Sequence, residues 1–501
     1  MATTIGADPK ADFGRRPSAK GVGRRSISFR LIPPIDAEPG SIAFAQTRWG
    51  KLALLGLFTC GFYLLERNWR EAGAVMGILL AASFFPQYRR WIVTVATLFW
   101  LFLSVPSWFD WTLPHDIAEH YRVASTFDFS FLRRVALLMV LGLSALLLGV
   151  AYRYPKSLLA RRPMVTLCAL YFGLLSLAYF GLRDRAAVAV WSIVVTLGAL
   201  FWFLGYAILD HRNRDRDSVG LQMGTFHPFW GSTTTPFPKG AAYLRRIEAK
   251  DAQGLAVTQL KGLKLILWAV ILSVSYSCWV RIVHGTLHIP TFQDAFDRSV
   301  ARAPYPCYVC WLTVIAGFAE DLLILSVWGH KFVACCRMAG FHALRNTYRP
   351  LQATTIAEFW NRYYFYFKEL MVDFFFYPTF FRYFKGRRRL RIAAATFMAA
   401  GFGNLFFHFI RDIRYVAELG LRKALIGYHV YAFYCLALSA GIAASQLRKK
   451  DQRRQQPRPW LKLSSTFGVI AFYCLLQIFD DTGRTRPITA HFAFLLHLFG
   501  R

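Results

Sequence analysis

The stretch AAVAVWSIVVTLGALFWFLGYAIL, residues 186–209, decides the fold class of the chain. It carries no charged residue, and as a helix rising about 1.5 Å per residue it is long enough to cross a hydrocarbon core of about 30 Å. A backbone in lipid must satisfy its own hydrogen bonds, and the run lacks the alternation typical of a barrel strand. It is therefore predicted to be a transmembrane helix.

Other apolar runs recur along the whole chain. Hydrophobic residues make up 55% of the sequence, which exceeds what the core of a soluble protein needs. The sequence predicts an all-α polytopic membrane protein with roughly ten to twelve membrane helices. Besides 186–209, the uncharged stretches lie near residues 52–65, 72–86, 91–109, 135–152, 164–182, 265–280, 308–328, 392–410, 424–447, 463–479 and 488–500.

The net charge of +32 has the distribution expected of a membrane protein. Basic residues flank the apolar runs, and no separate basic module with interleaved stacking aromatics exists, so nucleic acid is not expected as a partner. The positive-inside bias places basic clusters on the cytoplasmic side and the acidic loop 110–134 outside. The segments predicted to be cytoplasmic are the N-terminal tail, 87–90, 153–162, 212–216 and 449–458.

Two regions of different character follow from composition. Residues 1–48 are basic and rich in Gly, Pro and Ser without an apolar core, and they are predicted to form a disordered cytoplasmic tail with no cleavable signal peptide. Residues 49–501 are predicted to form a single membrane-embedded domain. The nine cysteines lie mostly in apolar runs without ligand partners at metal spacing, so they are expected to be buried free thiols and no metal site is expected.

A polar and aromatic passage interrupts the apolar sequence at residues 337–378, which read RMAGFHALRNTYRPLQATTIAEFWNRYYFYFKELMVDFFFYP. Glu358 and Arg362 stand four residues apart, so on a helix they can form an ion pair. Glu369 and Asp373 have the same spacing, with Lys368 beside them. Ion pairs of this kind are predicted to hold the passage together.

The same passage conflicts with a simple crossing of the membrane. A span over 363–381 would carry the basic residues 385–389 to the outer side, against the positive-inside bias. A re-entrant or tilted segment removes the conflict, and such backbone is tolerated where it is buried in protein or lines a water-filled cavity. Glu320 and Asp321 also interrupt the apolar run 308–328, which indicates either a polar cavity or a helix end.

A histidine follows in the apolar stretch GFGNLFFHF, residues 401–409. A neutral imidazole at His408 could take a proton from a hydroxyl group and so act as a general base. Asn404 and Asp412 lie four residues before and after His408, so all three can share one helical face. On this interpretation Asn404 binds an oxygen and Asp412 orients the imidazole, although Asp412 can equally lie at the outer water interface.

These two elements resemble the signature region of the membrane-bound O-acyltransferase family, in particular its branch of bacterial polysaccharide O-acetylases and D-alanyl transferases. The resemblance covers residues 337–411 and includes the membrane-embedded His408. The matching elements before that histidine are Arg337-Met338, Gly340-Phe341, Asn346, Pro350, Ile356, Glu358-Phe359-Trp360, Arg362, Asp373 and Pro378.

The resemblance implies a helical fold around a central tunnel, located in the bacterial inner (plasma) membrane with a cytoplasmic N-terminus. It implies a thioester donor, acyl-coenzyme A or an acyl carrier protein, with no bound cofactor, and a hydroxyl-bearing acceptor such as a glycan, a lipid or a secreted metabolite. Membrane lipid is a further expected partner. His408 would be the general base, while Glu358, Trp360, Arg362 and Asp373 would shape the substrate tunnel.

The chain also departs from the family pattern. Where bacterial members carry a histidine after Arg-Trp, this chain has Tyr364, and the usual serine two positions later is Tyr366. A phenol can donate a hydrogen bond to an oxyanion but is a poor base at neutral pH. His330 stands where the O-acetylases tend to carry an aspartate and could bind substrate or simply be structural.

The sequence therefore predicts an acyltransferase that transfers the acyl group directly, with His408, Tyr364 and Asn404 as catalytic residues. Tyr364 or Asn404 would stabilise the carbonyl oxygen. The alternative is a membrane scaffold or transporter that retains the fold without catalysis.

Overall fold

The protein is all-α in the part of the chain that the structure describes. The computed structural model describes residues 31–103, 110–210, 217–230, 239–448, 459–480 and 486–500. Within these ranges the backbone forms helices and connecting turns, with one isolated antiparallel bridge between Glu248 and Phe341 and no β-strand. The predicted fold class is confirmed.

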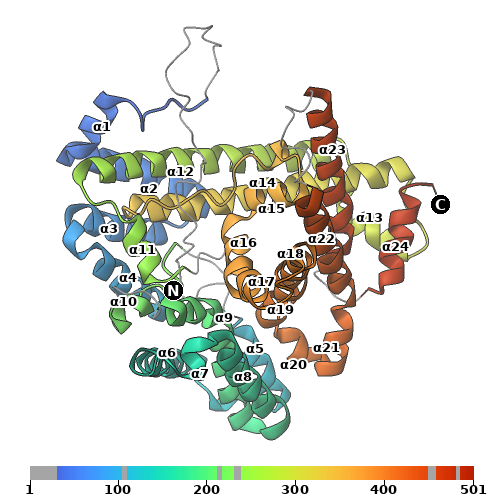
Figure 1. The fold of residues 1–501 in the computed structure, drawn as a ribbon, viewed down its shortest axis with the longest axis horizontal. Coiled ribbons are helices and arrows are strands. Elements are labelled where there is room, and N and C mark those ends of the chain that lie inside the picture. Colours follow the sequence, from blue (N-terminus) through green and yellow to red (C-terminus); the bar gives the residue numbers. More distant parts are fainter. Residues whose placement is uncertain are drawn as a thin grey trace.

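The two longest helices, α12 and α14, lie side by side (Figure 1). Polar side chains cap several of the helices: Asp128 accepts hydrogen bonds at the start of α6 and Asp251 does so at the start of α12. The bounds are α1 Pro39–Gln46, α2 Arg48–Glu66, α3 Trp69–Phe84, α4 Arg89–Leu103, α5 Thr112–His120, α6 Phe129–Arg153, α7 Leu158–Arg161, α8 Pro163–Ser176, α9 Asp184–Leu209, α10 Val219–Met223, α11 Ala241–Ile247, α12 Ala252–Val280, α13 Phe292–Val300 and α14 Cys307–Met338.

Shorter helices dominate the second half. The bounds are α15 Ile356–Tyr363, α16 Phe365–Met371, α17 Tyr377–Arg382, α18 Arg388–Thr396, α19 Asn404–Arg411, α20 Arg414–Leu419, α21 Leu421–Gly427, α22 His429–Arg448, α23 Pro459–Leu476 and α24 Ile488–His497. Wider π-helical turns continue four helices: η3 Leu177–Gly181 after α8, η5 Arg281–Thr286 after α12, η7 Val372–Phe376 between α16 and α17, and η8 Phe397–Gly403 between α18 and α19.

Eight helical segments of the described chain are long and apolar enough to cross a membrane. The protein is therefore an integral membrane protein, with fewer such segments than the roughly ten to twelve expected. The helices over 52–65, 72–86 and 488–500 are shorter or less apolar than the others. The eight segments are Phe129–Arg153, Pro163–Gly181, Asp184–Leu209, Ala252–Thr286, Cys307–Met338, Arg388–Arg411, His429–Arg448 and Trp460–Phe479.

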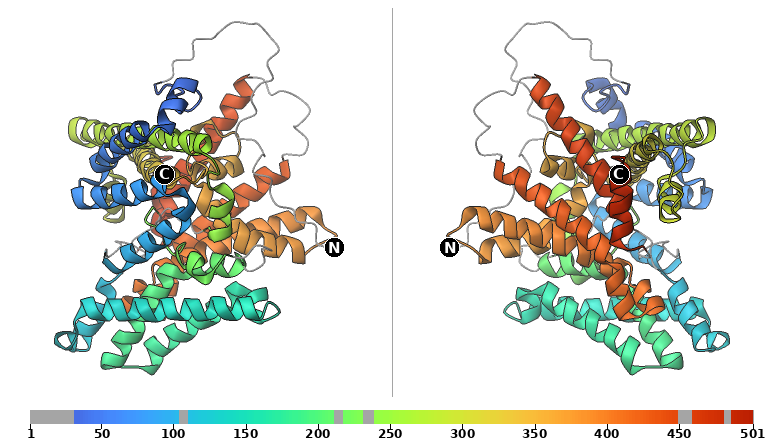
Figure 2. Two further views of the ribbon diagram at one scale, coloured as in Figure 1. Left: turned by 90° about the vertical axis from the view of Figure 1, so that its left-hand side faces the viewer. Right: turned by 90° about the vertical axis from the view of Figure 1, so that its right-hand side faces the viewer.

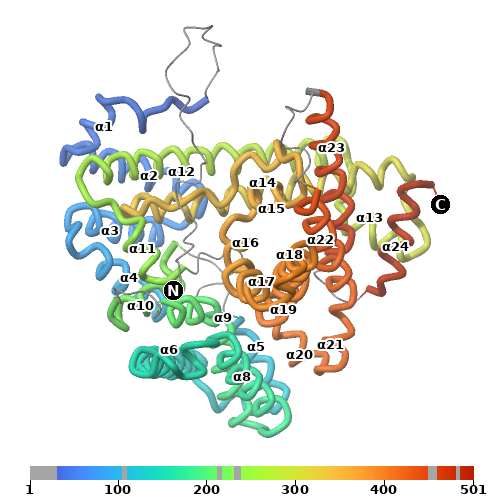
Figure 3. The backbone as a smooth tube through the Cα atoms, in the orientation of Figure 1, coloured from blue at the N-terminus to red at the C-terminus, as the bar shows by residue number. Residues whose placement is uncertain are grey.

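Two large hydrophobic cores organise these helices. One core joins α6, α8 and α9 to α16 and α19, and the other joins α2 and α3 to α12 and α14. Smaller cores link α13 with α24, and α15 with α22 and α23. In the tube of Figure 3, α22 runs beside the α18–α19 segment, and α23 packs against α22. The polar passage predicted from the sequence thus lies between the two large cores.

Part of the predicted disordered tail is helical. Residues 39–46 form α1, whose Ala45 is buried, and Asp36 before it pairs with Lys264 of α12 at 2.5 Å. The contact with α12 fixes this segment, so the predicted disorder does not extend to residue 48. Residues 1–30 of the predicted tail lie outside the described residues, as do the basic segments 212–216 and 449–458.

The region predicted to be re-entrant is built from short pieces. The helix that begins at Phe365 changes to the π-helical turns of η7 and ends at Arg382, and after a tight turn α18 packs back along α17. The two π-helical segments approach closely at Gly403, where a Cβ atom would lie 2.6 Å from Cδ2 of Phe375. This contact requires glycine, and it brings the start of α19 against η7.

Candidate active site

His408, Asn404 and Asp412 lie on and just after the short helix α19, which continues the π-helical turns of η8. Wide turns of this kind are frequent at functional sites. The His408 ring is partly buried, and its Nδ1 lies 3.9 Å from Oδ2 of Asp412, as expected for residues four apart on a helix. His408 and Asp412 therefore lie on the same side of the helix end, as their spacing predicts.

Asp412 is bound more closely by Arg411 than by His408. The Arg411 guanidinium donates to both carboxylate oxygens, at 2.6 Å from Nε to Oδ1 and 2.9 Å from Nη2 to Oδ2. A bidentate pair of this kind fixes the carboxylate in position. Asp412 can thus stabilise a positive charge on His408 only from a distance, and its orientation is set by Arg411.

Asn404 is almost completely buried, with 1% of its surface exposed. Its Oδ1 accepts a hydrogen bond from the hydroxyl of Tyr431 on α22 at 3.3 Å, while its Nδ2 has no hydrogen-bond partner among the described residues. A buried donor without a partner costs free energy, so the site holds an N–H group available to a bound oxygen. The Tyr431 ring also packs against the His408 ring, with centroids 4.4 Å apart.

Tyr364 lies at the junction of α15 and α16 and faces the same region. Its ring packs edge-on against Phe367, whose ring in turn packs against Phe407, next to His408. Burial raises the pKa of the Tyr364 phenol, and the nearby charge of Arg411 opposes that rise. Tyr364 is therefore a neutral hydrogen-bond donor at physiological pH, as the sequence analysis expected of a phenol.

Glu358 and Arg362 form the predicted ion pair on α15, with Arg362 Nη2 2.8 Å from Glu358 Oε1. The other carboxylate oxygen of Glu358 accepts from the backbone N–H and the hydroxyl of Thr354, at 2.9 and 3.0 Å. Burial alone would raise the pKa of Glu358, but these bonds and Arg362 outweigh it and lower the pKa. The pair thus fixes the start of α15, while Trp360 packs against Phe367.

Asp373 belongs to a second polar cluster. It accepts from the hydroxyl of Tyr206 and from Lys239, each at 2.7 Å, and Lys239 also lies 3.4 Å from Glu369. Burial would lower the pKa of Lys239, but Asp373 and Glu369 outweigh it and raise that pKa. This cluster ties η7 to α9 and to the segment before α11.

His330 lies apart from both groups, on α14. It is 8% exposed, and its Nδ1 lies 2.6 Å from the carbonyl oxygen of Ser326 on the same helix. The guanidinium groups of Arg337 and Arg345 interact electrostatically with the His330 ring. Tyr366, the other departure from the family pattern, donates from its hydroxyl to the carbonyl of Leu344 at 3.0 Å. The His330 contact lies within α14, and the Tyr366 hydrogen bond joins α16 to the loop after α14.

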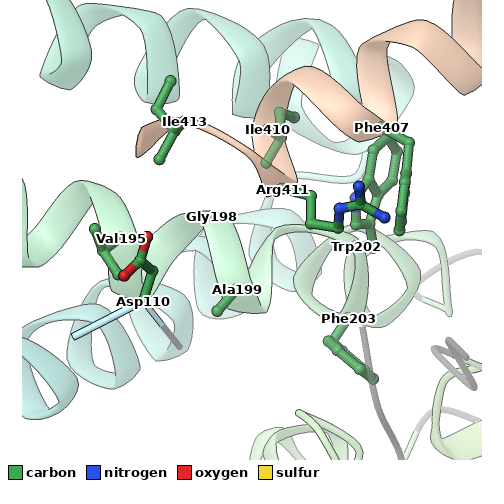
Figure 4. Close-up of a pocket in the computed structure, with 10 residues that line it drawn as sticks. All are labelled: Asp110, Val195, Gly198, Ala199, Trp202, Phe203, Phe407, Ile410, Arg411 and Ile413. Atoms are coloured by element: carbon green, nitrogen blue, oxygen red, sulfur yellow. The ribbon is translucent and has the colours of Figure 1, made fainter. Parts of the chain in front are cut away.

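A cavity of about 30 Å³ lies on the other side of α19, between that helix and α9. Figure 4 shows Arg411 beside Phe407 and Trp202 at one end, and Asp110 at the other. This volume suits about one or two water molecules. The predicted tunnel, which would have to admit a substrate, stays a prediction.

Other charged groups in the region have partners of their own. Glu320, which interrupts the apolar run of α14, lies 2.8 Å from Nε2 of His284, and the hydroxyl of Tyr363 donates to the backbone oxygen of Asp321 at 3.4 Å. His115, Asp116 and Glu119 on α5 present ligand atoms within 4.8 Å of one another. This group is largely exposed, and Asp116 is paired with Arg414 at 2.6 Å, so we assign no metal to it.

Sequence reasoning missed the residues that come to the site from far along the chain. Tyr431 is one of several tyrosines on an apolar helix, and nothing in its neighbourhood in the sequence marks it. Lys239 precedes α11, whereas its partners are on α16 and η7. Arg414, just after α19, pairs with Asp110 at 2.6 Å, which joins that end of α19 to the segment predicted to lie outside.

Comparison of the chain with protein-family models and with curated proteins finds no match. The class established by the fold is thus an integral, all-α membrane protein with a partly buried group of polar side chains around α19. The resemblance to the O-acyltransferases rests on the sequence motifs alone.

Proposed function

We propose that the protein is a membrane-bound O-acyltransferase that moves an acyl group from a cytoplasmic thioester to a hydroxyl acceptor, with His408 as general base. The observation that carries this proposal is the grouping of His408 with two donors suited to a carbonyl oxygen. These are the Nδ2 of buried Asn404, which has no partner in the described part of the chain, and the phenol of Tyr364. They accompany a sequence pattern that resembles the family.

The proposed reaction proceeds by direct transfer. A neutral His408 takes the proton of the acceptor hydroxyl as the oxygen attacks the thioester carbonyl, and the carbonyl oxygen becomes an oxyanion. The N–H of Asn404 or the O–H of Tyr364 donates to that oxyanion. The tetrahedral intermediate then expels the thiolate, which takes the proton from the imidazolium and leaves as a free thiol. Asp412, held by Arg411, stabilises the imidazolium.

The proposed donor is acyl-coenzyme A or an acyl carrier protein, and the proposed acceptor is a glycan, a lipid or a secreted metabolite. We propose the bacterial inner membrane as the location, with a cytoplasmic N-terminus. The pairing of Arg414 with Asp110 and Asp116 supports this topology, because it puts the segment 110–120 and the C-terminal end of α19 on one face of the protein. That face would be the outer one.

The experiment that tests this function uses purified protein in detergent with a panel of acyl thioesters, and follows release of the free thiol in the presence of hydroxyl acceptors. His408→Ala should lower turnover by about 10² to 10⁴, the usual contribution of a general base. His497→Ala is the matched control, since His497 also lies in an apolar helix but bonds to the carbonyl of Tyr305. Near-normal turnover in His408→Ala contradicts the assignment.

The alternative is a scaffold or transporter that retains the fold without catalysis. The cavity of about 30 Å³ between α19 and α9 suits water-sized molecules and is not itself a site for an acyl chain. If the wild type and Tyr364→His, which restores the family histidine, are both inert toward every thioester while a lipid or partner still binds, the alternative is correct.

A further inference from the structure

Helices α17 and α18, with the turn between them, form a hairpin that extends from the rest of the molecule. It is drawn in orange in Figure 2, where it reaches out to one side in both views. We call residues 377–391 the basic hairpin. Every residue from 381 to 390 is exposed, and Phe384 in the turn adopts a left-handed conformation with φ of 53°.

The charge of the basic hairpin is entirely positive. No aspartate or glutamate occurs between Asp373 and Asp412, a stretch that crosses the whole hairpin and continues through α19. None of its basic side chains has an acidic partner in the described structure. The basic residues are Arg382, Lys385, Arg387, Arg388, Arg389 and Arg391.

Large apolar and aromatic side chains are exposed on the same hairpin. Arg391 packs over the ring of Phe380, 4.2 Å from its centroid, while the buried Nε of Arg391 finds no hydrogen-bond partner within the described ranges. Aromatic residues beside basic residues are typical of the membrane–water interface, where rings sit at headgroup level. The exposed members are Tyr377 at 40%, Phe381 at 55%, Tyr383 at 55%, Phe384 at 49% and Leu390 at 40%.

We propose that the basic hairpin is a binding site for the headgroups of anionic phospholipids in the leaflet that surrounds it. Arginines bind phosphate through several N–H donors in a fixed plane, and a cluster of basic residues at the end of a membrane helix is attracted to an anionic surface. The exposed rings enter the interface beside those headgroups. A soluble acidic protein fits less well, because it would leave these rings in water.

Lipid binding at the basic hairpin would also affect the residues around α19, because both arms of the hairpin lead to them. One arm continues through η7 and α16 to Tyr364, and the other continues through η8 to Asn404 and His408. Headgroups bound to the turn between α17 and α18 would therefore restrict the movement of Tyr364 on one arm and of Asn404 and His408 on the other. This consequence rests on the proposed function, whereas lipid binding by the hairpin does not.

The test places a fluorescent label at the tip. Gly386→Cys is suitable because a Cβ atom there would meet nothing within 4 Å, and the exposed Cys60, Cys278 and Cys307 are replaced by serine beforehand. An environment-sensitive dye is attached to the full-length protein. The protein is then placed in nanodiscs of phosphatidylcholine alone or mixed with phosphatidylglycerol.

The label should shift to shorter wavelength when phosphatidylglycerol is present, and high salt should reverse the shift. Replacing Arg387, Arg388 and Arg389 by Gln should weaken the preference for anionic lipid on the order of a hundredfold, because each basic residue near the surface contributes about a fivefold preference. The matched control removes the same charge elsewhere, by Gln at the exposed Arg153, Lys156 and Arg162. It should leave the shift intact.

Three outcomes overturn the proposal. Equal emission in both kinds of nanodisc means that the hairpin does not select anionic lipid. Loss of the shift in both triple variants means that total charge rather than the hairpin is responsible. An equal shift with soluble glycerophosphoglycerol, or a shift that requires an acidic protein instead of lipid, means that the occupant is not the membrane surface. Because none of these readouts is enzymatic, they stand apart from a failure of the proposed function.

Discussion

Replacing Gly403 by Ala tests how α19 is positioned. A Cβ atom at Gly403 would lie 2.6, 2.8 and 3.0 Å from three atoms of the Phe375 ring, whereas carbon atoms normally stay about 3.5 to 4.0 Å apart. The ring cannot easily move away, because Trp202, Phe402 and Phe406 pack around it at centroid distances of 6.0 to 6.3 Å. Overpacking of this kind costs about 1–3 kcal/mol.

The matched control is Gly142→Ala on α6, where a Cβ atom meets nothing within 4 Å. That variant should be neutral or more stable by up to about 1 kcal/mol, because alanine favours a helix over glycine. Unfolding of purified protein in detergent should therefore show Gly403→Ala less stable than the wild type and Gly142→Ala at least as stable. Gly403→Ala with Phe375→Leu should recover part of the loss. Equal stability of the two single variants would refute the argument from close packing.

Three further predictions concern single contacts. Tyr431→Phe should destabilise the protein by about 1–3 kcal/mol, measured by unfolding in detergent, because it leaves the buried Oδ1 of Asn404 without its donor; an unchanged midpoint contradicts this. Arg414→Gln should increase proteolysis of the segment 110–120, which contains α5, while stability falls by no more than about 1 kcal/mol per exposed pair, and an unchanged cleavage rate contradicts the proposed bridge. Because the pKa of Glu358 is lowered in the folded protein, its ionised form stabilises the fold above the unfolded pKa of about 4.3, and this contribution is lost as the pH falls through the folded pKa. The acid-induced fall in melting temperature should therefore be smaller in Glu358→Gln than in the wild type. An identical fall in both proteins refutes the role of that carboxylate.

The features that were predictable from the sequence are the local ones. Uncharged runs such as 186–209 identify membrane helices, because length and hydropathy are properties of a contiguous segment. The Glu358–Arg362 pair and the shared face of His408 and Asp412 follow from helical spacing, and both are present. These relations extend over no more than four residues, so they do not depend on the tertiary fold.

The features that were not predictable depend on which helices are neighbours. Asp373 has an acidic residue four positions before it, and its cation, Lys239, comes from 134 residues earlier in the chain. Tyr431 reaches Asn404 only because α22 packs beside η8 and α19. The segment 39–46 ends a basic tail rich in Gly, Pro and Ser whose composition suggests disorder, and its helix is fixed by contact with α12. No periodicity in the sequence encodes such contacts.

The polar group around α19 lies where helices are interrupted, and this location has a physical cause. Each break, at Tyr364 between α15 and α16 and at the π-helical turns of η8, leaves backbone groups outside the regular hydrogen-bond pattern. Lipid cannot satisfy such groups, so broken helices persist at membrane depth only where protein surrounds them. The aromatic contacts from Phe367 through Phe407 supply that enclosure. The enclosure that permits the breaks also keeps Asn404 out of water, and a donor kept out of water interacts strongly with any oxyanion that forms beside it.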